Sequence, residues 1–341
     1  MEDQNPDHQL NRPGPKTIVY KFNENKNLVL GLEITPNSIN GTLIDLGKKI
    51  LFKKSYPIEE NLDNVNLYRH VRNTFYGIIE DSGKPEESIT TLVFALTGAL
   101  DRDKLIWTTS PKIHSVKSVD FHFFEESLPH VKRVFIEHDI TARANSIIRT
   151  DNAHPHNFAF LHISDGVGMT VMNDGAYIRG HRGLAGELGH IPMLGYNKIE
   201  GIPCYCGKTH CLESFLSSKA LLHHIKNTYG VTLAAINEAP EILNKHQIDE
   251  IFQLVQELML NITTTIVNLF DPQVIYIGGC VAETWYTFIE ESFIDLIKKQ
   301  SWQGGPERIQ FYHEESTNPS YGAAISVIPT TVKKILLEVL T

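Results

Sequence analysis

The sequence contains few cysteines, no long apolar run and no excess of positive charge. Only 4 of its 341 residues are cysteine, so a disulfide framework cannot organise the fold. No stretch is apolar for long enough to span a bilayer, and the first residues lack the basic-then-apolar pattern of a secretory signal. We therefore expect a cytoplasmic protein that has no membrane partner.

The formal net charge of -9 argues against nucleic-acid binding along the whole chain, although it leaves room for a local basic patch. Hydrophobic residues make up 42% and charged residues 21% of the sequence, as in ordinary globular proteins. A chain of 341 residues is long enough for two domains that each bury a core.

The order of predicted elements divides the chain into a polar arm and two similar halves. Residues 1–16 are polar and rich in proline, which predicts a flexible arm. The first half is predicted to contain strands at 28–34, 39–45, 49–56, 91–96 and 133–136, and helices near 67–81 and 141–148. The second half is predicted to contain strands at 158–163, 169–172, 177–179 and 274–277, and helices near 249–270, 281–299 and from Gly322 onward with a bend at Pro329. Because a strand meander, helices and apolar strands occur twice, we expect two α/β domains that face a cleft.

Three of the four cysteines, Cys204, Cys206 and Cys211, lie within eight residues of each other. Zinc takes four tetrahedral ligands from thiolates and imidazoles, and three thiolates on a tight loop would supply three of them. The fourth ligand must come from a nearby histidine, either His190 or His210. A closed site of this kind has no open position, so the spacing predicts a structural Zn2+. The alternative is three cysteines that hold no metal.

A second motif, GLAGELGH at residues 183–190, places Glu187 and His190 three residues apart. On a helical turn they share a face, and a carboxylate beside a metal-held imidazole could bind ligand hydroxyls. Taken alone, the motif favours the simpler interpretation of a surface glutamate and a core histidine.

The two motifs together resemble the ROK family (repressors, open reading frames and sugar kinases), and within it the NagC/XylR-type repressors. The family pattern combines G-x-x-G-E-x-G-H with C-x-C-G-x-x-G-C-x-E, found here at 183–190 and 204–213 with His210 in place of a glycine. The resemblance covers about residues 17–335. It implies an α/β fold of the actin-like ATPase and ribonuclease H type, with two similar lobes and a central ligand cleft. It also implies that His190 is the fourth zinc ligand.

The resemblance further implies where the lobes and the sugar lie. Residues 17–137 would form the N-terminal lobe, completed by the C-terminal helix 322–341, and residues 138–321 would form the C-terminal lobe with the zinc site. The positions that would contact a sugar are Gly98, His138, Asp139, Glu187, His190 and Glu213. Asp139 matches the aspartate that acts as the base in the kinases, whereas His138 replaces the usual asparagine. Read alone, Asp139 fits a helix N-cap equally well.

The two phosphate loops of the family's kinases are altered here. The altered positions are Glu33, Thr35, Pro36 and Asn37 in the first loop, and Asp165, Gly166 and Gly168 in the second. Glu33 stands where an aspartate is expected, and Pro36 removes an N–H that could bind phosphate. Asp165 brings a carboxylate toward the γ-phosphate, and Met169 and Thr170 stand where the kinases have glycine, although Gly166 and Gly168 remain. We therefore predict that the chain uses neither ATP nor Mg2+.

Residues 11–15 (NRPGP), followed by the run 17–22, resemble the junction that follows the helix-turn-helix of ROK repressors. Residues 1–10 are too few for such a module. We expect no DNA binding by the chain as given, unless the module is missing from it. The expected partners are a sugar or sugar-phosphate effector and copies of the same chain in a homodimer or homotetramer. Two alternatives stay open: an ATP-dependent kinase of a hexose or N-acetylhexosamine with divergent phosphate loops, and a scaffold that binds no sugar.

Overall fold

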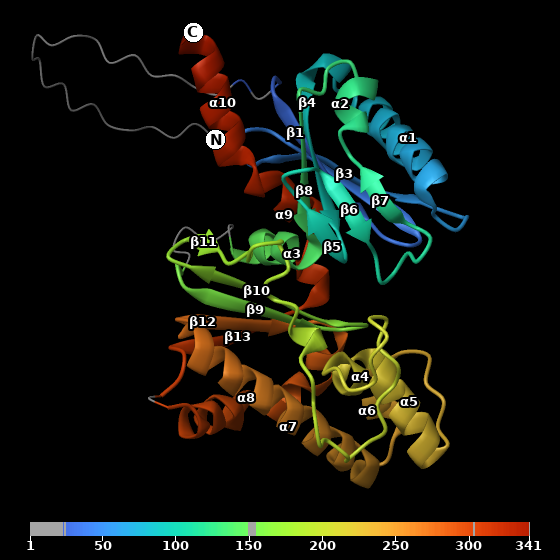
Figure 1. The fold of residues 1–341 in the computed structure, drawn as a ribbon, viewed down its shortest axis with the longest axis vertical. Helices are drawn as coiled ribbons and strands as arrows, with labels where there is room; N and C mark the ends of the chain where they lie inside the picture. Colours follow the sequence, from blue (N-terminus) through green and yellow to red (C-terminus); the bar gives the residue numbers. More distant parts are fainter. Residues whose placement is uncertain (1–22, 24, 149–154, 303, 341) are drawn as a thin grey trace, which may run out of the picture.

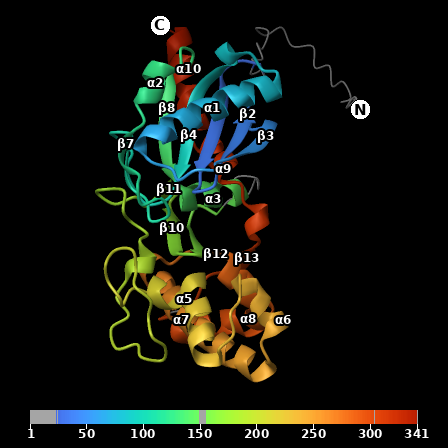
Figure 2. The same ribbon diagram turned by 90° about the vertical axis from the view of Figure 1, so that its right-hand side faces the viewer.

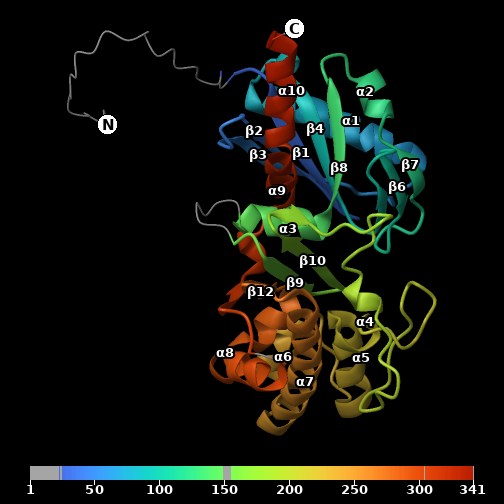
Figure 3. The same ribbon diagram turned by 60° about the vertical axis from the view of Figure 1, so that its left-hand side comes forward.

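The structure is a computed structural model that describes residues 23, 25–148, 155–302 and 304–340. The predicted arm at 1–16 and the junction at 11–15 lie outside the described residues. Figures 1, 2 and 3 show an elongated molecule in which one sheet lies above the other and helices pack around both. Within the described part of the chain, no helix is long and apolar enough to cross a membrane.

The predicted meander and the two apolar strands after it form the first sheet. In spatial order its strands are β3 (Ile50–Pro57), β2 (Ser38–Ile44), β1 (Leu28–Ile34), β4 (Ile89–Leu96) and β8 (Arg133–His138). β1, β2 and β3 pair antiparallel, whereas β4 and β8 run parallel to β1. Every residue of β1 and β4 is buried, as expected for central strands that are covered on both faces.

The second sheet repeats this arrangement. In spatial order its strands are β11 (Ala176–Tyr177), β10 (Val167–Asn173), β9 (Phe158–Ile163), β12 (Val274–Gly278) and β13 (Arg308–Tyr312). β9, β10 and β11 are antiparallel, and β12 and β13 continue the sheet in parallel with β9. The predicted repetition is therefore confirmed. The predicted return strand at 177–179 is shorter than expected, and edge strand β13 was not predicted.

Helices cover the first sheet on both faces. α1 (Asn64–Ser82) and α2 (Phe123–Ser127) lie on one face of this sheet (Figure 1). The short turn η1 (Glu86–Ser88) connects α1 to β4. Asp63 caps α1 by accepting hydrogen bonds from two backbone N–H groups, and Gly83 ends the helix in the left-handed conformation. Between the sheets lie α3 (Asp139–Ile148) and α9 (Pro319–Ser326), and α10 (Ile328–Leu340) continues toward the C-terminus (Figures 1 and 3).

Two glycines allow α9 to pack closely against its neighbours. A Cβ atom on Gly31 would lie 1.8 Å from the carbonyl oxygen of Ser320, and one on Gly322 would lie 1.7 Å from that of Ala142. The prediction of one bent helix from Gly322 onward is wrong, because α9 and α10 are separate helices. Pro329 lies in the first turn of α10, where its missing N–H leaves no helical bond unmade.

A small third sheet, which the sequence patterns did not reveal, stands beside the first. Its order is β5 (Ala99–Asp101), β6 (Ile106–Thr109) and β7 (Lys117–Asp120). Trp107 of β6 is fully buried, and its indole N–H donates to the carbonyl oxygen of Thr97 at 3.0 Å. This bond fixes the end of β4, where the candidate site begins.

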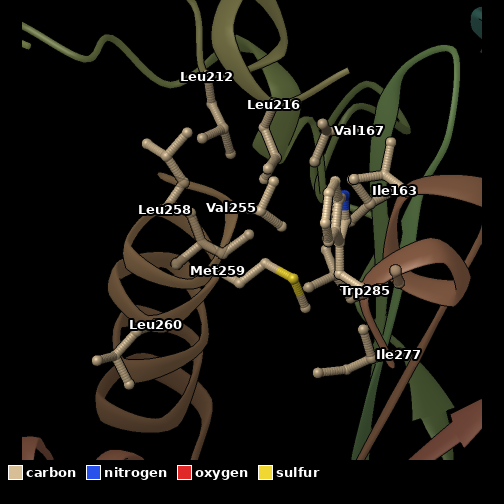
Figure 4. Close-up of a cluster of buried hydrophobic side chains, with 14 of the residues drawn as sticks. Ile163, Val167, Leu212, Leu216, Val255, Leu258, Met259, Leu260, Ile277 and Trp285 are labelled. Atoms are coloured by element: carbon tan, nitrogen blue, oxygen red, sulfur yellow. The ribbon is translucent and has the colours of Figure 1, made fainter. Parts of the chain in front are cut away.

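The second sheet packs against a helical layer. Its members are α4 (Glu213–Leu216), α5 (Ser218–Tyr229), α6 (Ala239–Ile242), α7 (Lys245–Phe270) and α8 (Cys280–Gln300), with the short turns η2 (Leu188–His190), η3 (Ile236–Glu238) and η4 (Glu314–Ser316). Figure 4 shows Trp285 of α8 and Met259 of α7 filling the space between these helices and Ile277 of β12. The sequence predicted α7 and α8, but not the shorter helices.

Candidate ligand cavity and metal centre

Strand ends from both sheets border one cavity of about 460 Å3. β4 leads into Gly98, β8 leads into Asp139, and the turn between β9 and β10 contributes residues 164–168. Ligands bind at such strand ends in open α/β sheets, and a volume of this size suits a small organic molecule. The cavity wall includes all six residues predicted to bind a sugar: Gly98, His138, Asp139, Glu187, His190 and Glu213.

Asp139 begins α3 and faces the cavity with a fixed carboxylate. Thr97 donates its hydroxyl hydrogen to Oδ2 at 2.8 Å, and the N–H of Ile140 donates to Oδ1 at 2.9 Å. The imidazole Nδ1 of His138 lies 3.2 Å from Oδ1. The carboxylate therefore bonds to the N–H of the next residue at the start of α3, without the N2 or N3 bond of an N-cap, and lines the cavity.

The charge of Asp139 follows from its neighbours. Burial tends to raise the pKa of this carboxyl group, whereas the nearby charges of His138 and Lys112 lower it. Arg143 and the Thr97 hydrogen bond act in the same direction, so the net pKa of Asp139 is below its ordinary value. The group is a carboxylate at neutral pH and can accept a hydrogen bond from a ligand hydroxyl.

Gly98 sits where no side chain fits. Its φ of +105° is in the left-handed region, and a Cβ atom would lie 2.2 Å from the carbonyl oxygen of Thr109 and 2.9 Å from Pro111. The close approach holds the end of β4 against the loop between β6 and β7, and both segments line the cavity.

The predicted metal ligands come together. The donor atoms of His190, Cys204, Cys206 and Cys211 all lie within 4.8 Å of one another. The Cys204 Sγ to His190 Nδ1 distance is 3.4 Å, and the two sulfurs of Cys206 and Cys211 are 3.5 Å apart. Ligand atoms around a tetrahedral zinc ion lie roughly 3.5 Å from each other. His210 is exposed and is not part of the cluster, so the structure selects His190 as the only histidine of the group among the described residues.

The metal cluster and the cavity share a wall. His190 turns Nδ1 toward the thiols, whereas its Nε2 lies 2.8 Å from the Tyr205 hydroxyl and 3.7 Å from Glu187. Glu213 begins α4, where its Oε2 accepts the N–H of Val167 at 3.3 Å. His190, Glu187 and Glu213 all line the cavity, so an ion bound at Nδ1 would fix which edge of the His190 ring faces a ligand.

The first altered phosphate segment lies outside the cavity wall and is closed by its own side chains. Glu33 is buried, accepts a hydrogen bond from the amide of Asn40 at 2.9 Å and pairs with Arg143 at 3.4 Å. Thr35 and Ser38 bond to each other through side-chain and backbone groups across the turn that contains Pro36 and Asn37. Glu33, Thr35 and Ser38 are therefore engaged with groups of the protein itself.

The second altered phosphate segment lines the cavity but faces carboxylates. Asp165 accepts a hydrogen bond from the hydroxyl of Ser218 at 2.7 Å. A Cβ atom on Gly166 would lie 2.8 Å from Glu213 Oε2, and one on Gly168 would lie 2.8 Å from Ile140. An anion at this turn would meet the negative charges of Asp165 and Glu213.

Several cavity residues were not predicted, among them Lys112, Arg143 and His162. Arg143 lies one helical turn after Asp139 and pairs with Glu33 of β1 and, at 3.2 Å, with Glu314 of η4. His162 of β9 contacts the Tyr312 hydroxyl at 2.8 Å, and burial lowers its pKa to about 3. Only Arg143 carried a signal in the sequence, through its i, i+4 spacing from Asp139.

Comparison with known proteins gives the family. Residues 29–328 match the ROK family. The chain belongs to the ROK family. It is 24% identical over 278 residues to the xylose repressor of Bacillus subtilis, covering 80% of this chain and 69% of the repressor. It is also 24% identical over 297 residues to the DNA-binding transcriptional dual regulator NagC of Escherichia coli, covering 81% of this chain and 69% of NagC.

Solved structures confirm the predicted actin-like α/β fold. A ROK family transcriptional regulator, a homologue of the Escherichia coli MLC protein, superposes with a TM-score of 0.73 at 20% identity, covering 89% of this chain and 79% of the other. A ROK hexokinase from Thermus thermophilus superposes with a TM-score of 0.69 at 22% identity, covering 90% and 99%. Regulators and kinases thus share this fold, and the fold alone does not separate the two activities.

Proposed function

We propose that this chain is the sugar-sensing, effector-binding part of a NagC/XylR-like transcriptional regulator, and that it has no kinase activity. The observation that carries the proposal is the closure of the first phosphate segment, where Glu33 is bound by Asn40 and Arg143. Both oxygens of this carboxylate already have a partner, and the adjacent guanidinium charge of Arg143 opposes a second cation, so Mg2+ binding there is disfavoured. The carboxylates of Asp165 and Glu213 at the second segment would repel a triphosphate.

The cavity supports binding of a sugar. Ionised Asp139 accepts hydrogen bonds, and Glu187 and Glu213 line the same space. Sugar hydroxyl groups are donors that suit several carboxylates around one cavity, and each charge-assisted bond is stronger than a neutral one. The relatives named as a xylose repressor and as NagC are regulators, which favours an effector over a substrate.

We further propose that the ion held by His190 and the three cysteines is Zn2+, because a Cys3His donor set at these distances suits this metal. The closed set gives zinc no open position, so its contribution is structural. It would hold the 204–211 loop to His190 and fix the tautomer of that imidazole, so that Nε2 carries the proton that faces Tyr205 and the ligand.

Ligand binding would favour one arrangement of the two halves, and a homodimer or homotetramer in the cytoplasm would pass that preference to a DNA-binding module or another partner. The ligand contacts in this scheme come from both halves, through Gly98 in the first and Glu187 in the second.

The main test is a coupled ADP-release assay against hexoses, N-acetylhexosamines and pentoses, run in parallel with thermal-shift measurements on the same sugars. We expect no ADP release and a rise in Tm with at least one sugar, since a ligand of the folded state must stabilise it. Asp139→Asn should remove that rise. Asp103→Asn, an exposed position outside the cavity, serves as the matched control and should retain the rise.

The assay also decides between this proposal and a sugar kinase. The kinase alternative is favoured by one observation, the ionised Asp139 at the position where a general base would act. ADP release that depends on both sugar and Asp139 would establish the kinase and overturn the sensor. The absence of any thermal shift with every sugar would favour a scaffold instead.

A further inference from the structure

We propose that Glu137 and Arg179 are positioning residues for the ligand, and that their ion pair between the two sheets sets the spacing of Asp139 and Glu187. The proposal rests on the proposed ligand-binding function of the cavity and adds two residues that act from behind its wall. Neither of the two side chains is part of the cavity wall as the structure describes it.

Glu137 is a buried carboxylate that two arginines share. It lies in β8 of the first sheet, its side chain is only 7% exposed, and Arg102 from the turn between β5 and β6 pairs with it. Arg179, which follows β11 of the second sheet, donates from Nη1 and Nη2 to Oε2 of the same carboxylate at 3.2 Å each. The pair with Arg102 stays within the first half of the chain, whereas the pair with Arg179 joins the two sheets.

Glu137 reaches the first ligand-binding group through the backbone. Its Oε1 accepts the N–H of His138 at 2.8 Å, and Asp139 follows at the start of α3. The imidazole Nδ1 of His138 in turn lies 3.2 Å from the Asp139 carboxylate. The conformation of Glu137 therefore bears on the backbone position from which both of these side chains enter the cavity.

Arg179 reaches the second ligand-binding group in a similar way. Its carbonyl oxygen accepts the N–H of Ala185 at 3.1 Å. Gly186 comes next with a φ of +97°, and a Cβ atom there would lie 2.4 Å from the carbonyl oxygen of Met169. Because such close packing leaves the segment little freedom, a shift of Arg179 would be passed on to Glu187, which follows Gly186.

Charge balance alone gives no reason for the second arginine, because Arg102 by itself matches the charge of Glu137. Burial, together with the positive charge of Arg179, lowers the pKa of Arg102 to about 9. The two guanidinium groups therefore repel each other, and Glu137 holds them together. They border a small cavity of about 40 Å3 whose wall also includes His138 and Glu187. What Arg179 adds to this cluster is the link between the two sheets.

Isothermal titration calorimetry tests the proposal with glucose, xylose and N-acetylglucosamine, each as the free sugar and as a phosphate ester. Arg179→Met and Arg102→Met each remove one guanidinium group from the same carboxylate, so Arg102→Met is the matched control. We expect Arg179→Met to weaken the tightest of these ligands about tenfold, and Arg102→Met to change its Kd by less than about twofold. Arg179→Lys retains the charge but not the two-pronged geometry, so it should weaken binding only about threefold. It serves as the test variant if Arg179→Met does not fold.

Hydrogen exchange of the free protein gives a measurement that needs no ligand. In Arg179→Met the amides of residues 183–190 should exchange about fivefold or more faster than in the wild type, since the contact that holds this segment is loosened. Arg102→Met should leave their exchange unchanged.

An unchanged Kd in Arg179→Met overturns the proposal even if Tm falls, because the cluster would then serve stability alone. Equal weakening in Arg179→Met and Arg102→Met also overturns it, because the link between the sheets would not matter. If the wild type binds none of these sugars, the proposed function fails and exchange decides the positioning role separately. Faster exchange of 183–190 in Arg179→Met alone would then support that role, and unchanged exchange would refute it.

Discussion

Arg143 joins the two halves of the chain, and its replacement by methionine gives the sharpest test of the packing described above. Its guanidinium group on α3 pairs with Glu33 of the first sheet at 3.4 Å and with Glu314 of η4 at 3.2 Å, and it donates to the Thr317 hydroxyl at 2.9 Å. Arg143→Met retains most of the side-chain volume and removes all three interactions. The Glu33 carboxylate would then be left buried without its cation.

The expected loss of unfolding free energy is about 3 kcal/mol. Removal of one partner of a buried ion pair costs about 3–5 kcal/mol, and the side chains of Arg143 and Glu33 are only 13% and 11% exposed. Their separation is longer than that of a short charge-assisted bond, which places the loss at the low end of the range. The pair with Glu314 adds little, since that carboxylate is 36% exposed and screened by solvent.

The loss should depend on pH in a defined direction. Burial raises the pKa of Glu314, and Arg143 opposes this effect. In Arg143→Met the folded-state pKa of Glu314 rises further above its unfolded value. Protonation of Glu314 therefore contributes to the unfolding free energy of the variant at low pH, and this contribution is lost as pH rises. The deficit of the variant should therefore be largest at neutral pH and shrink between about pH 7 and pH 4.

Urea unfolding of the wild type, Arg143→Met, Glu33→Gln and the double variant at pH 7 and pH 5 measures these quantities. The double variant should be more stable than the sum of the single losses predicts, because neither buried charge is then left alone. Additive losses would show that Arg143 and Glu33 do not interact in solution. A loss below about 1 kcal/mol would refute the buried pair itself.

Three further predictions follow from other parts of the structure. Cys211→Ser should lower the zinc content from the expected one ion per chain and lower Tm by several degrees. Metal analysis and calorimetry measure the two effects. A metal-free wild type of unchanged stability would contradict the prediction. Burial lowers the folded-state pKa of His162 to about 3, so the unfolding free energy of the wild type should fall by up to about 1.4 kcal/mol per pH unit as pH falls below 6.5. In His162→Gln this dependence on pH should be weaker by the contribution of one proton. Urea unfolding of both proteins at pH 6 and pH 4.5 measures the difference. Gly322→Ala should cost about 1–3 kcal/mol, because the new methyl group meets the Ala142 carbonyl; wild-type stability in thermal unfolding would show that α9 and α3 are not in close contact.

The sequence predicted most of the fold because the central strands are apolar and sharply bounded. β1, β4 and β9 are buried throughout, so each reads as a continuous apolar run between turn residues. The small third sheet and β13 were not predicted from the sequence, because their strands are short or carry exposed side chains at alternate positions. Pairing of such edges depends on tertiary contacts that no local pattern contains.

The site shows the same division between local and distant information. The cysteine spacing predicted the metal cluster and the family resemblance implied His190 as its histidine; the structure places that ring beside the thiols through the turn η2. Lys112 could not be found in this way. It is one lysine in a polar loop, and it becomes a cavity residue only because Gly98 holds the neighbouring turn against that loop.

The two altered phosphate segments have different physical consequences for a nucleotide. At the first segment, Glu33 is tied to Arg143, and restoration of an aspartate there would still leave the arginine in place. At the second, Gly166 and Gly168 remain, but Met169 and Thr170 replace two glycines and the carboxylates of Asp165 and Glu213 oppose an anion. If the chain is a sensor without kinase activity, as we propose, repair of either loop alone should not restore phosphoryl transfer. Arg143, the guanidinium group nearest Asp139 along α3, is engaged in a bridge between the halves, so its charge is balanced by Glu33 and Glu314 before any phosphoryl group could approach.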